Sequence, residues 1–293
     1  MTTAHNEDID AHTGTSTTGH EWDGIRELNT PLPKWWLYIF YATIVWSLGY
    51  FVVYPSWPLI SSHTPCVLGW SSRGAVTADL DSLQKQRAPM VSALSAASLA
   101  DIAKDEKLRG FAVAQGRAAF GDNCAPCHGS GGGGSPSFPN LNDDDWIWGG
   151  TLEDIRQTIA FGIRSGHENA RLGAPMPAFG LTGMLKASEI SQLADHVRAI
   201  AGLPTEKGYD AAAAGKLYGE QCASCHGDAG KGNQELGAPN LTDKIWLFGS
   251  DKAVIADGIN RGRGSVMPAW NGRLDDTTIK ALAVYVHGLG GGK

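Results

Sequence analysis

The sequence predicts an all-α protein in which one membrane-spanning helix is followed by two tandem helical domains. Three observations predict this fold class. An uncharged, aromatic-rich run covers residues 35–54, and a Cys-x-x-Cys-His string occurs twice. Each string is followed by a Met-Pro-Ala string and then an amphipathic stretch. The expected order is a polar tail over residues 1–34, an anchor over 35–57, a linker over 58–108, and two domains over 109–204 and 208–290.

The run from Trp35 to Tyr54 is long enough to cross a lipid bilayer. At about 1.5 Å per residue it spans about 30 Å, the thickness of the hydrocarbon core. Its Trp and Tyr residues gather near both ends, as in aromatic belts. A buried helix of a soluble protein would need a comparable partner helix, which the sequence lacks. A cleaved signal peptide is disfavoured because the run starts late, is long and has no small-residue cleavage site. We therefore expect an uncleaved anchor.

The segments on either side of the anchor carry weaker patterns. Residues 1–34 are polar and rich in Thr, Asp, Glu and His, which is typical of a mobile tail. The stretch from Asp79 to Arg109 alternates polar residues with Ala and Leu and is expected to be helical. Cys66 is the odd cysteine of the chain. We expect an inert thiol packed near the membrane surface, with a reactive or intermolecular thiol as the alternative.

The two Cys-x-x-Cys-His strings are typical of c-type haem attachment. Two thiols at this spacing can react with the two vinyl groups of one haem, and the adjacent His then lies under the iron. A zinc site would place the two pairs roughly 15–20 residues apart, whereas roughly a hundred residues separate them here. A thioredoxin-like pair would need a βαβ pattern, and a structural disulfide would not need the His. The sequence thus predicts two covalently bound haem c groups, held by Cys124, Cys127, Cys222 and Cys225, with His128 and His226 as axial ligands.

Two methionines are candidates for the second axial position of each iron. Met176 and Met267 both precede Pro-Ala, and only five Met occur in the chain. A thioether or imidazole at that position is typical of an electron carrier, whereas an open position allows peroxide chemistry. A single Met often only fills space in a core, but Met176 and Met267 occupy the same place in the two copies of a repeat. The simple expectation pairs each Met with the His of its own copy. An exchange of the two loops between copies stays open.

The repeat extends beyond the haem strings and makes each copy resemble the small cytochrome c domain. Pro-Asn-Leu occurs at residues 139–141 and 239–241, and Trp146 corresponds to Trp246. We also match residues 159–163 with 255–259. Each copy ends in a stretch with the i, i+3, i+4, i+7 spacing of a helix with one buried face. These apolar positions are Ile190, Leu193, Ala194 and Val197 in one copy, and Ile279, Leu282, Ala283 and Val286 in the other.

Charge excludes one class of partner and indicates an orientation. The net charge of −6 and the pI near 5.8 give no case for nucleic-acid binding. The acidic run at residues 143–145 is expected to be a solvated turn, with a face for a basic donor as the alternative. Arg26 and Lys34 precede the anchor and Arg73 is the first basic residue after it, so the N-terminus is expected in the cytoplasm. Haem c is attached outside the bacterial cytoplasmic membrane, so the two domains are expected in the periplasm.

The strings around the anchor resemble the dihaem subunit III of cbb3-type cytochrome c oxidases. They are WDGIRELN at residues 22–29, PLPKWW at 31–36, YPSWPLI at 54–60 and LGWSSRG at 68–74. The resemblance implies a subunit of the bacterial inner membrane, in a proton-pumping oxidase, without a catalytic site of its own. It implies partners: a donor cytochrome c, a monohaem cytochrome c subunit, and the haem–copper subunit that reduces oxygen. A tethered dihaem shuttle, or a cytochrome subunit of a periplasmic dehydrogenase, is the alternative. A dihaem peroxidase is disfavoured because it needs an iron open to substrate.

Overall fold

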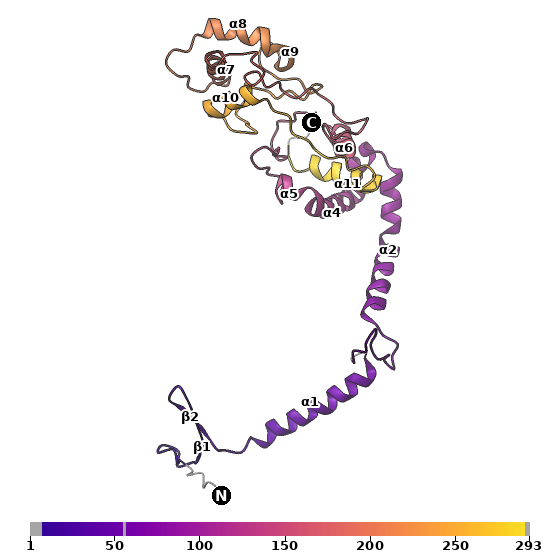
Figure 1. The fold of residues 1–293 in the computed structure, drawn as a ribbon. Coiled ribbons are helices and arrows are strands. Elements are labelled where there is room, and N and C mark those ends of the chain that lie inside the picture. The colour runs from indigo at the N-terminus through magenta and orange to yellow at the C-terminus, as the bar shows by residue number, and fades with distance from the viewer. Residues whose placement is uncertain (1–7, 55–56, 291–293) are drawn as a thin grey trace. The chain divides into compact units, whose positions relative to one another are not determined.

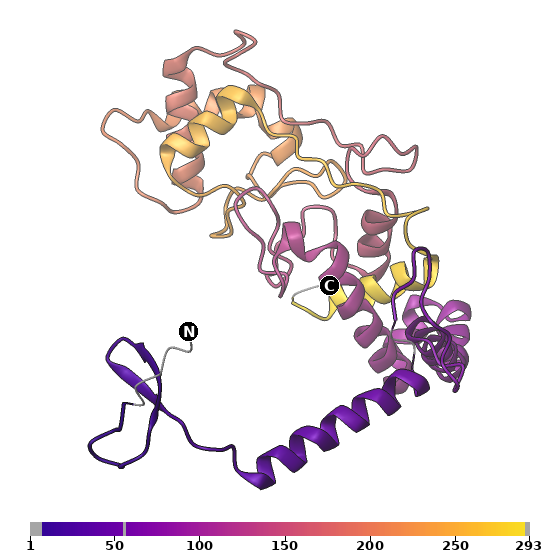
Figure 2. The same cartoon turned by 60° about the horizontal axis from the view of Figure 1, so that its bottom comes forward.

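The computed structural model describes residues 8–54 and 57–290. The chain divides into two compact units, residues 1–85 and residues 86–293. Figure 1 and Figure 2 draw both units, and each is described here by itself. Residues 1–7 of the expected tail and residues 55–56 of the expected anchor lie outside the described residues.

The first unit begins with a β-hairpin. Strand β1 (Thr17–Trp22) pairs antiparallel with β2 (Ile25–Leu28), and Trp22 stands opposite Ile25. Asp23 and Gly24 form the turn with φ values of 50° and 85°. Asp-Gly favours this two-residue turn because both positions need positive φ. Regular structure is therefore present where the sequence was expected to form a mobile tail, although the two strands are minor in a mostly helical protein.

Helix α1 (Lys34–Val53) follows the hairpin and matches the expected apolar run. It has 20 residues and a mean hydropathy of 1.6 over its most apolar window. Among the described residues it is the one helix long and apolar enough to cross a membrane. Its aromatic rings form a column, with centroids 5.4 Å apart for Trp46 and Tyr50 and 4.8 Å apart for Tyr50 and Tyr54. Trp70 packs edge-on against Tyr54 at 5.4 Å and extends this column beyond the helix.

The stretch from residue 79 to residue 109 is helical as expected, and it contains two breaks. Helix α2 (Ser72–Ala96) precedes α3 (Leu99–Lys104), which precedes α4 (Glu106–Asn123). The side chains of Ser98 and Asp105 accept hydrogen bonds from the N–H groups of Asp101 and Leu108, at 3.1 and 2.9 Å. Such capping satisfies the free amide groups that begin a helix. Periodicity alone does not show where one helix ends and the next begins.

The second unit contains two helical groups, and each combines elements of both sequence copies. The first helical group consists of α3, α4, α5 (Ala125–His128), α6 (Leu152–Phe161) and α11 (Asp276–His287). The second helical group consists of α7 (Ala187–Ile200), α8 (Ala211–Gln221), α9 (Ala223–His226) and α10 (Lys252–Arg261). Figure 1 shows α11 beside α4 and α6, and α7 beside α8 and α10. The terminal helix of each copy therefore packs in the group that holds the other copy's haem string.

The expected amphipathic faces of the two terminal helices are buried. Leu193 and Leu282 are both fully buried, and they belong to separate cores, one in each group. At the contact between α4 and α11, a Cβ placed on Gly116 would lie only 2.3 Å from the carbonyl oxygen of Ala281. Glycine at this position lets the two helix backbones approach closely.

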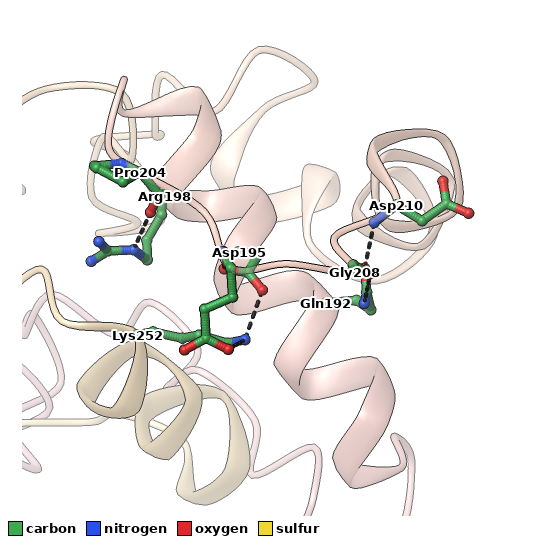
Figure 3. A network of polar contacts seen from close by, with 8 residues as sticks. Gln192, Asp195, Arg198, Pro204, Gly208, Asp210 and Lys252 are labelled. Carbon is green, nitrogen blue, oxygen red and sulfur yellow. Dashed lines mark hydrogen bonds and ion pairs between the residues drawn. The ribbon is translucent and has the colours of Figure 1, made fainter.

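Polar contacts fasten α7 to its neighbours (Figure 3). The Asp195 carboxylate is 2% exposed and lies 2.7 Å from Nζ of Lys252 at the start of α10. The same carboxylate accepts a hydrogen bond from the N–H of Glu206 at 3.1 Å. Gln192 donates to the carbonyl of Gly208 at 2.9 Å and accepts from the N–H of Asp210 at 2.8 Å. These contacts hold the connection between α7 and α8 against α7.

The two chain segments that pass between the groups pair with each other. We call residues 162–176 the first crossing segment and residues 262–270 the second crossing segment. Met267 exchanges two backbone hydrogen bonds with Ile163, both at 3.0 Å. Met176 exchanges two with Arg263, at 2.8 and 3.2 Å. The two Met-bearing segments therefore lie side by side where the groups meet.

The structure also corrects one register of the repeat. Helix α6 ends at Gly162 with a φ of 73°, and α10 ends at Gly262 with a φ of 75°. A Cβ on either glycine would collide with the carbonyl oxygen of Met267 or Met176, at 2.3 and 2.4 Å respectively. These two glycines are therefore equivalent, and the expected match of residues 159–163 with 255–259 was wrong. The expected match is displaced by about one helical turn. Such a shift leaves the apolar pattern nearly unchanged, because apolar positions repeat about every 3.6 residues.

Candidate haem sites

The two Cys-x-x-Cys-His strings adopt the same local structure. Each first cysteine ends a helix, α4 or α8, and the next four residues form the one-turn helix α5 or α9. Cys124 and Cys222 are half-buried, whereas Cys127 and Cys225 are exposed. One turn thus places two thiols and an imidazole at one edge of each group, as attachment of one haem requires.

Each histidine is held by the carbonyl of a proline in the following loop. The Nδ1 atom of His128 lies 3.0 Å from the oxygen of Pro139, and Nδ1 of His226 lies 3.0 Å from the oxygen of Pro239. A carbonyl can only accept, so Nδ1 carries the proton and Nε2 is left with its lone pair. Such a partner orients a ligating ring and makes it more basic. The repeated Pro-Asn-Leu string was the signal for this contact, but the sequence assigned it no role.

The two methionines lie with the string of the other copy. Met267 packs against the core of the first helical group, which includes Phe120 and borders Cys124. Met176 packs against the core of the second helical group, which includes Tyr218 and borders Cys222. Of the two pairings that the sequence leaves open, this packing favours the exchange between copies.

Burial adjusts the protonation of the site residues. It raises the pKa of Cys124 to about 11, with a smaller contribution from Cys127, and the pKa of Cys222 likewise to about 11, with a contribution from Cys225. Both thiols therefore stay protonated near neutral pH. Burial also lowers the pKa of His226, although its bond to Pro239 opposes this. The neutral imidazole is the form that binds a metal.

Two further observations fit a haem in these positions. The indole Nε1 of Trp146 is buried without a hydrogen-bond partner, so a donor is available beside the first string for a haem carboxylate. In both copies a glycine lets the loop close over the proline segment. A Cβ on Gly134 would lie 2.7 Å from the N atom of Asn140, and one on Gly232 would lie 2.7 Å from that of Asn240. The residues present therefore fit haem c in both copies.

The acidic run at residues 143–145 is only partly a solvated turn. Asp144 is exposed, but Asp143 and Asp145 are half-buried. Burial raises the pKa of Asp145 to about 6, and the charges of Asp243 and Asp143 add to this. Cys66 is also half-buried, and its Sγ lies 3.1 Å from the N atom of Trp70. Neither feature lies in the two strings.

Comparison with known proteins identifies the family of this chain. The family model of subunit III of cbb3-type cytochrome c oxidase matches residues 111–197 and 210–286. The model of the N-terminal domain of the FixP protein of cytochrome oxidase cbb3 matches residues 14–61.

Three curated relatives match along almost their whole length. The cbb3-type cytochrome c oxidase subunit FixP of Bradyrhizobium diazoefficiens is 62% identical over 291 residues, which cover 99% of this chain and 100% of the relative. The subunit CcoP of Azospirillum brasilense is 50% identical, over 97% of this chain and 98% of the relative. The CcoP subunit of Cereibacter sphaeroides is 44% identical, over 94% and 95%. The chain therefore belongs to the subunit III family of cbb3-type cytochrome c oxidases, and it is an electron-transfer subunit of such an oxidase.

Proposed function

We propose that this chain carries two haem c groups and that their Met ligands are exchanged between the sequence copies. Cys124 and Cys127 hold the first haem, with His128 and Met267 as its axial ligands. The second haem is held by Cys222 and Cys225, with His226 and Met176. The contact of each His with a proline carbonyl at 3.0 Å supports the two haem sites most directly, because it occurs in both copies. The packing of Met267 on the first core and of Met176 on the second supports the exchange.

When bound, haem c supplies a one-electron iron couple. The residues of this chain support fast electron transfer because they hold the axial ligands of each haem in fixed positions. The proline carbonyls fix the imidazole rings, the backbone pairs of Met176 and Met267 fix the thioethers, and the apolar cores exclude water from the Met side. Thioether ligation favours a high potential, which suits the oxygen-reducing end of a respiratory chain.

The same proposal gives the path and the location. Electrons enter from a donor cytochrome c and leave toward a monohaem subunit and then the haem–copper subunit. Helix α1 crosses the bacterial inner membrane once, with the N-terminus in the cytoplasm and the haem-bearing unit in the periplasm. The basic residues Arg26 and Lys34 before α1 support this orientation.

The number of haems is tested by mass spectrometry of the denatured chain. Two added haem masses are expected, and haem staining should persist in SDS because the thioether bonds are covalent. One added mass, or none, would contradict the proposal.

The exchange is tested with chains that hold one haem. Cys124→Ser with Cys127→Ser removes the first haem, so that the Met-to-iron charge-transfer band of the ferric protein reports only on the second. Adding Met176→Ala should abolish that band, whereas adding Met267→Ala should leave it. The opposite result would show that each Met serves its own copy. If neither substitution abolishes the band, the second haem has an axial ligand other than Met176 and Met267.

A further inference from the structure

A buried tryptophan lies where the two helical groups meet. Trp148 follows the first haem string and is 9% exposed. Its ring lies against two glycines of different segments. A Cβ placed on Gly173 would lie 2.5 Å from Cη2 of Trp148, and one placed on Gly237 would lie 2.0 Å from Cζ2. Gly173 belongs to the first crossing segment, and Gly237 belongs to the loop after the second haem string. The ring therefore fills a space that both backbones line.

Arg164 joins this ring to both crossing segments. Its guanidinium lies 5.9 Å from the centroid of the Trp148 ring. Its Nε donates to the carbonyl of Ser265 at 2.8 Å, and its Nη1 donates to the carbonyl of Gly173 at 3.3 Å. Ser265 precedes Met267 by two residues, and Gly173 precedes Met176 by three. One side chain thus binds the backbone of both Met-bearing segments.

The backbone at this position indicates a constraint. Arg164 has a φ of 48°, in the left-handed region that a bulky side chain rarely adopts. Such a conformation persists only when surrounding contacts impose it, and it is more frequent at functional sites. The neighbouring Ile163, which pairs with Met267, supplies one of those contacts.

The second copy has no equivalent arginine, because Gly264 stands at the position that corresponds to Arg164. The neighbouring Arg263 makes only local contacts through its side chain. Arg263 stacks on Phe248 at 4.3 Å and donates to the carbonyl of Val254 and the carboxylate of Asp257, both at 3.4 Å. These partners all lie in or directly before α10. The two copies therefore differ at this point, because the side chain of Arg164 binds both crossing segments and that of Arg263 binds neither.

We infer that Arg164 and Trp148 are positioning residues that set both Met loops at once and so couple the two haem sites. The inference rests on the Met ligation proposed above. A single change at this junction should therefore alter both axial contacts, whereas the same change at Arg263 should alter only the site of Met176. Arginine is required because its planar fork can donate in two directions while it stacks on a ring.

The test compares Arg164→Gln with Arg263→Gln in the full-length chain, purified in detergent with both haems attached. The readouts are the intensity of the Met-to-iron charge-transfer band and the two midpoint potentials from a redox titration. Arg164→Gln should weaken the band of both haems and shift both potentials. Arg263→Gln should shift one potential and leave the other at the wild-type value. Trp148→Phe, which keeps an aromatic ring but leaves part of the space empty, should shift both potentials in the same direction as Arg164→Gln.

The outcomes separate this inference from the proposed function. A wild-type chain without any Met-to-iron band would contradict the ligation itself. A wild-type chain with both bands, together with an Arg164→Gln variant that shifts one potential or none, would overturn the coupling alone. If Arg164→Gln does not accumulate, Arg164→Lys replaces it, and the same criterion of two shifted potentials decides.

Discussion

Gly116 of α4 offers a direct test of the packing of α11 on the first helical group. Gly116→Ala adds one methyl group, which would lie 2.3 Å from the carbonyl oxygen of Ala281 and 2.7 Å from Cβ of Tyr285. Overpacking of this kind costs about 1–3 kcal/mol, and a backbone oxygen cannot turn aside as a side chain can. Alanine is better than glycine in a helix by about 0.8–1 kcal/mol. The net result should be a loss of up to about 2 kcal/mol of stability.

Gly110 supplies the matched control in the same helix. A Cβ on Gly110 meets no atom within 4 Å, so Gly110→Ala should gain the helix-propensity term without a steric cost. The difference between the two variants isolates the steric cost, about 1–3 kcal/mol. Unfolding of the full-length chain in guanidinium, followed by the Met-to-iron band, measures it. Equal stability of the two variants would refute the close contact of α4 with α11.

Three further predictions concern other parts of the chain. Asp195→Asn removes the buried carboxylate that binds Lys252, although Lys252 keeps Glu206 at 2.6 Å, and should destabilise the second helical group by about 1–3 kcal/mol in a denaturant titration; no change would show that the Asp195 contact does not stabilise the group. Burial alone would raise the pKa of Asp154, but its hydrogen bonds to the Thr151 hydroxyl and to other groups lower this pKa below 3.8. The stability that this carboxylate contributes is therefore present above pH 3.8 and lost as the pH falls through the lower folded-state value. Thr151→Ala should shift acid unfolding toward higher pH, and an unchanged acid midpoint would exclude this role. Replacing residues 35–54 by a Leu/Ala helix should leave both haems attached but abolish co-purification with the oxidase, because large aromatics dominate buried interfaces; normal assembly would show a passive anchor.

The sequence predicts the chemistry of the sites better than the partners of the helices. The haem strings, the Met-Pro-Ala loops and the apolar run of α1 are visible because each depends on residue types at fixed local spacing. The amphipathic faces of α7 and α11 are equally visible, and both are buried as expected. Periodicity identifies a buried face but does not identify the helix that covers it. Since α4 and α8 each bury an aromatic ring four residues before the first cysteine, Phe120 and Tyr218, the exchange of α7 and α11 could not be read from the sequence.

Other differences have equally local causes. The hairpin before α1 depends on the Asp23-Gly24 turn, a signal that the polar composition of the segment obscures. The breaks between α2, α3 and α4 depend on the caps Ser98 and Asp105, which a periodic pattern does not distinguish from ordinary polar positions. The role of Arg164 depends on contacts with residues 9 and 101 positions away, and no single local motif includes both.

The exchange of terminal helices has a consequence for how the protein is made. Gln115 of α4 and Thr278 of α11 are joined by a hydrogen bond although 163 residues separate them. Synthesis starts at the N-terminus, so all elements of the second helical group, from α7 to α10, are made before α11. The first haem string is therefore the first to emerge and the last to be enclosed. If haem is attached to Cys124 and Cys127 as proposed, this string would stay accessible for that reaction until α11 is added.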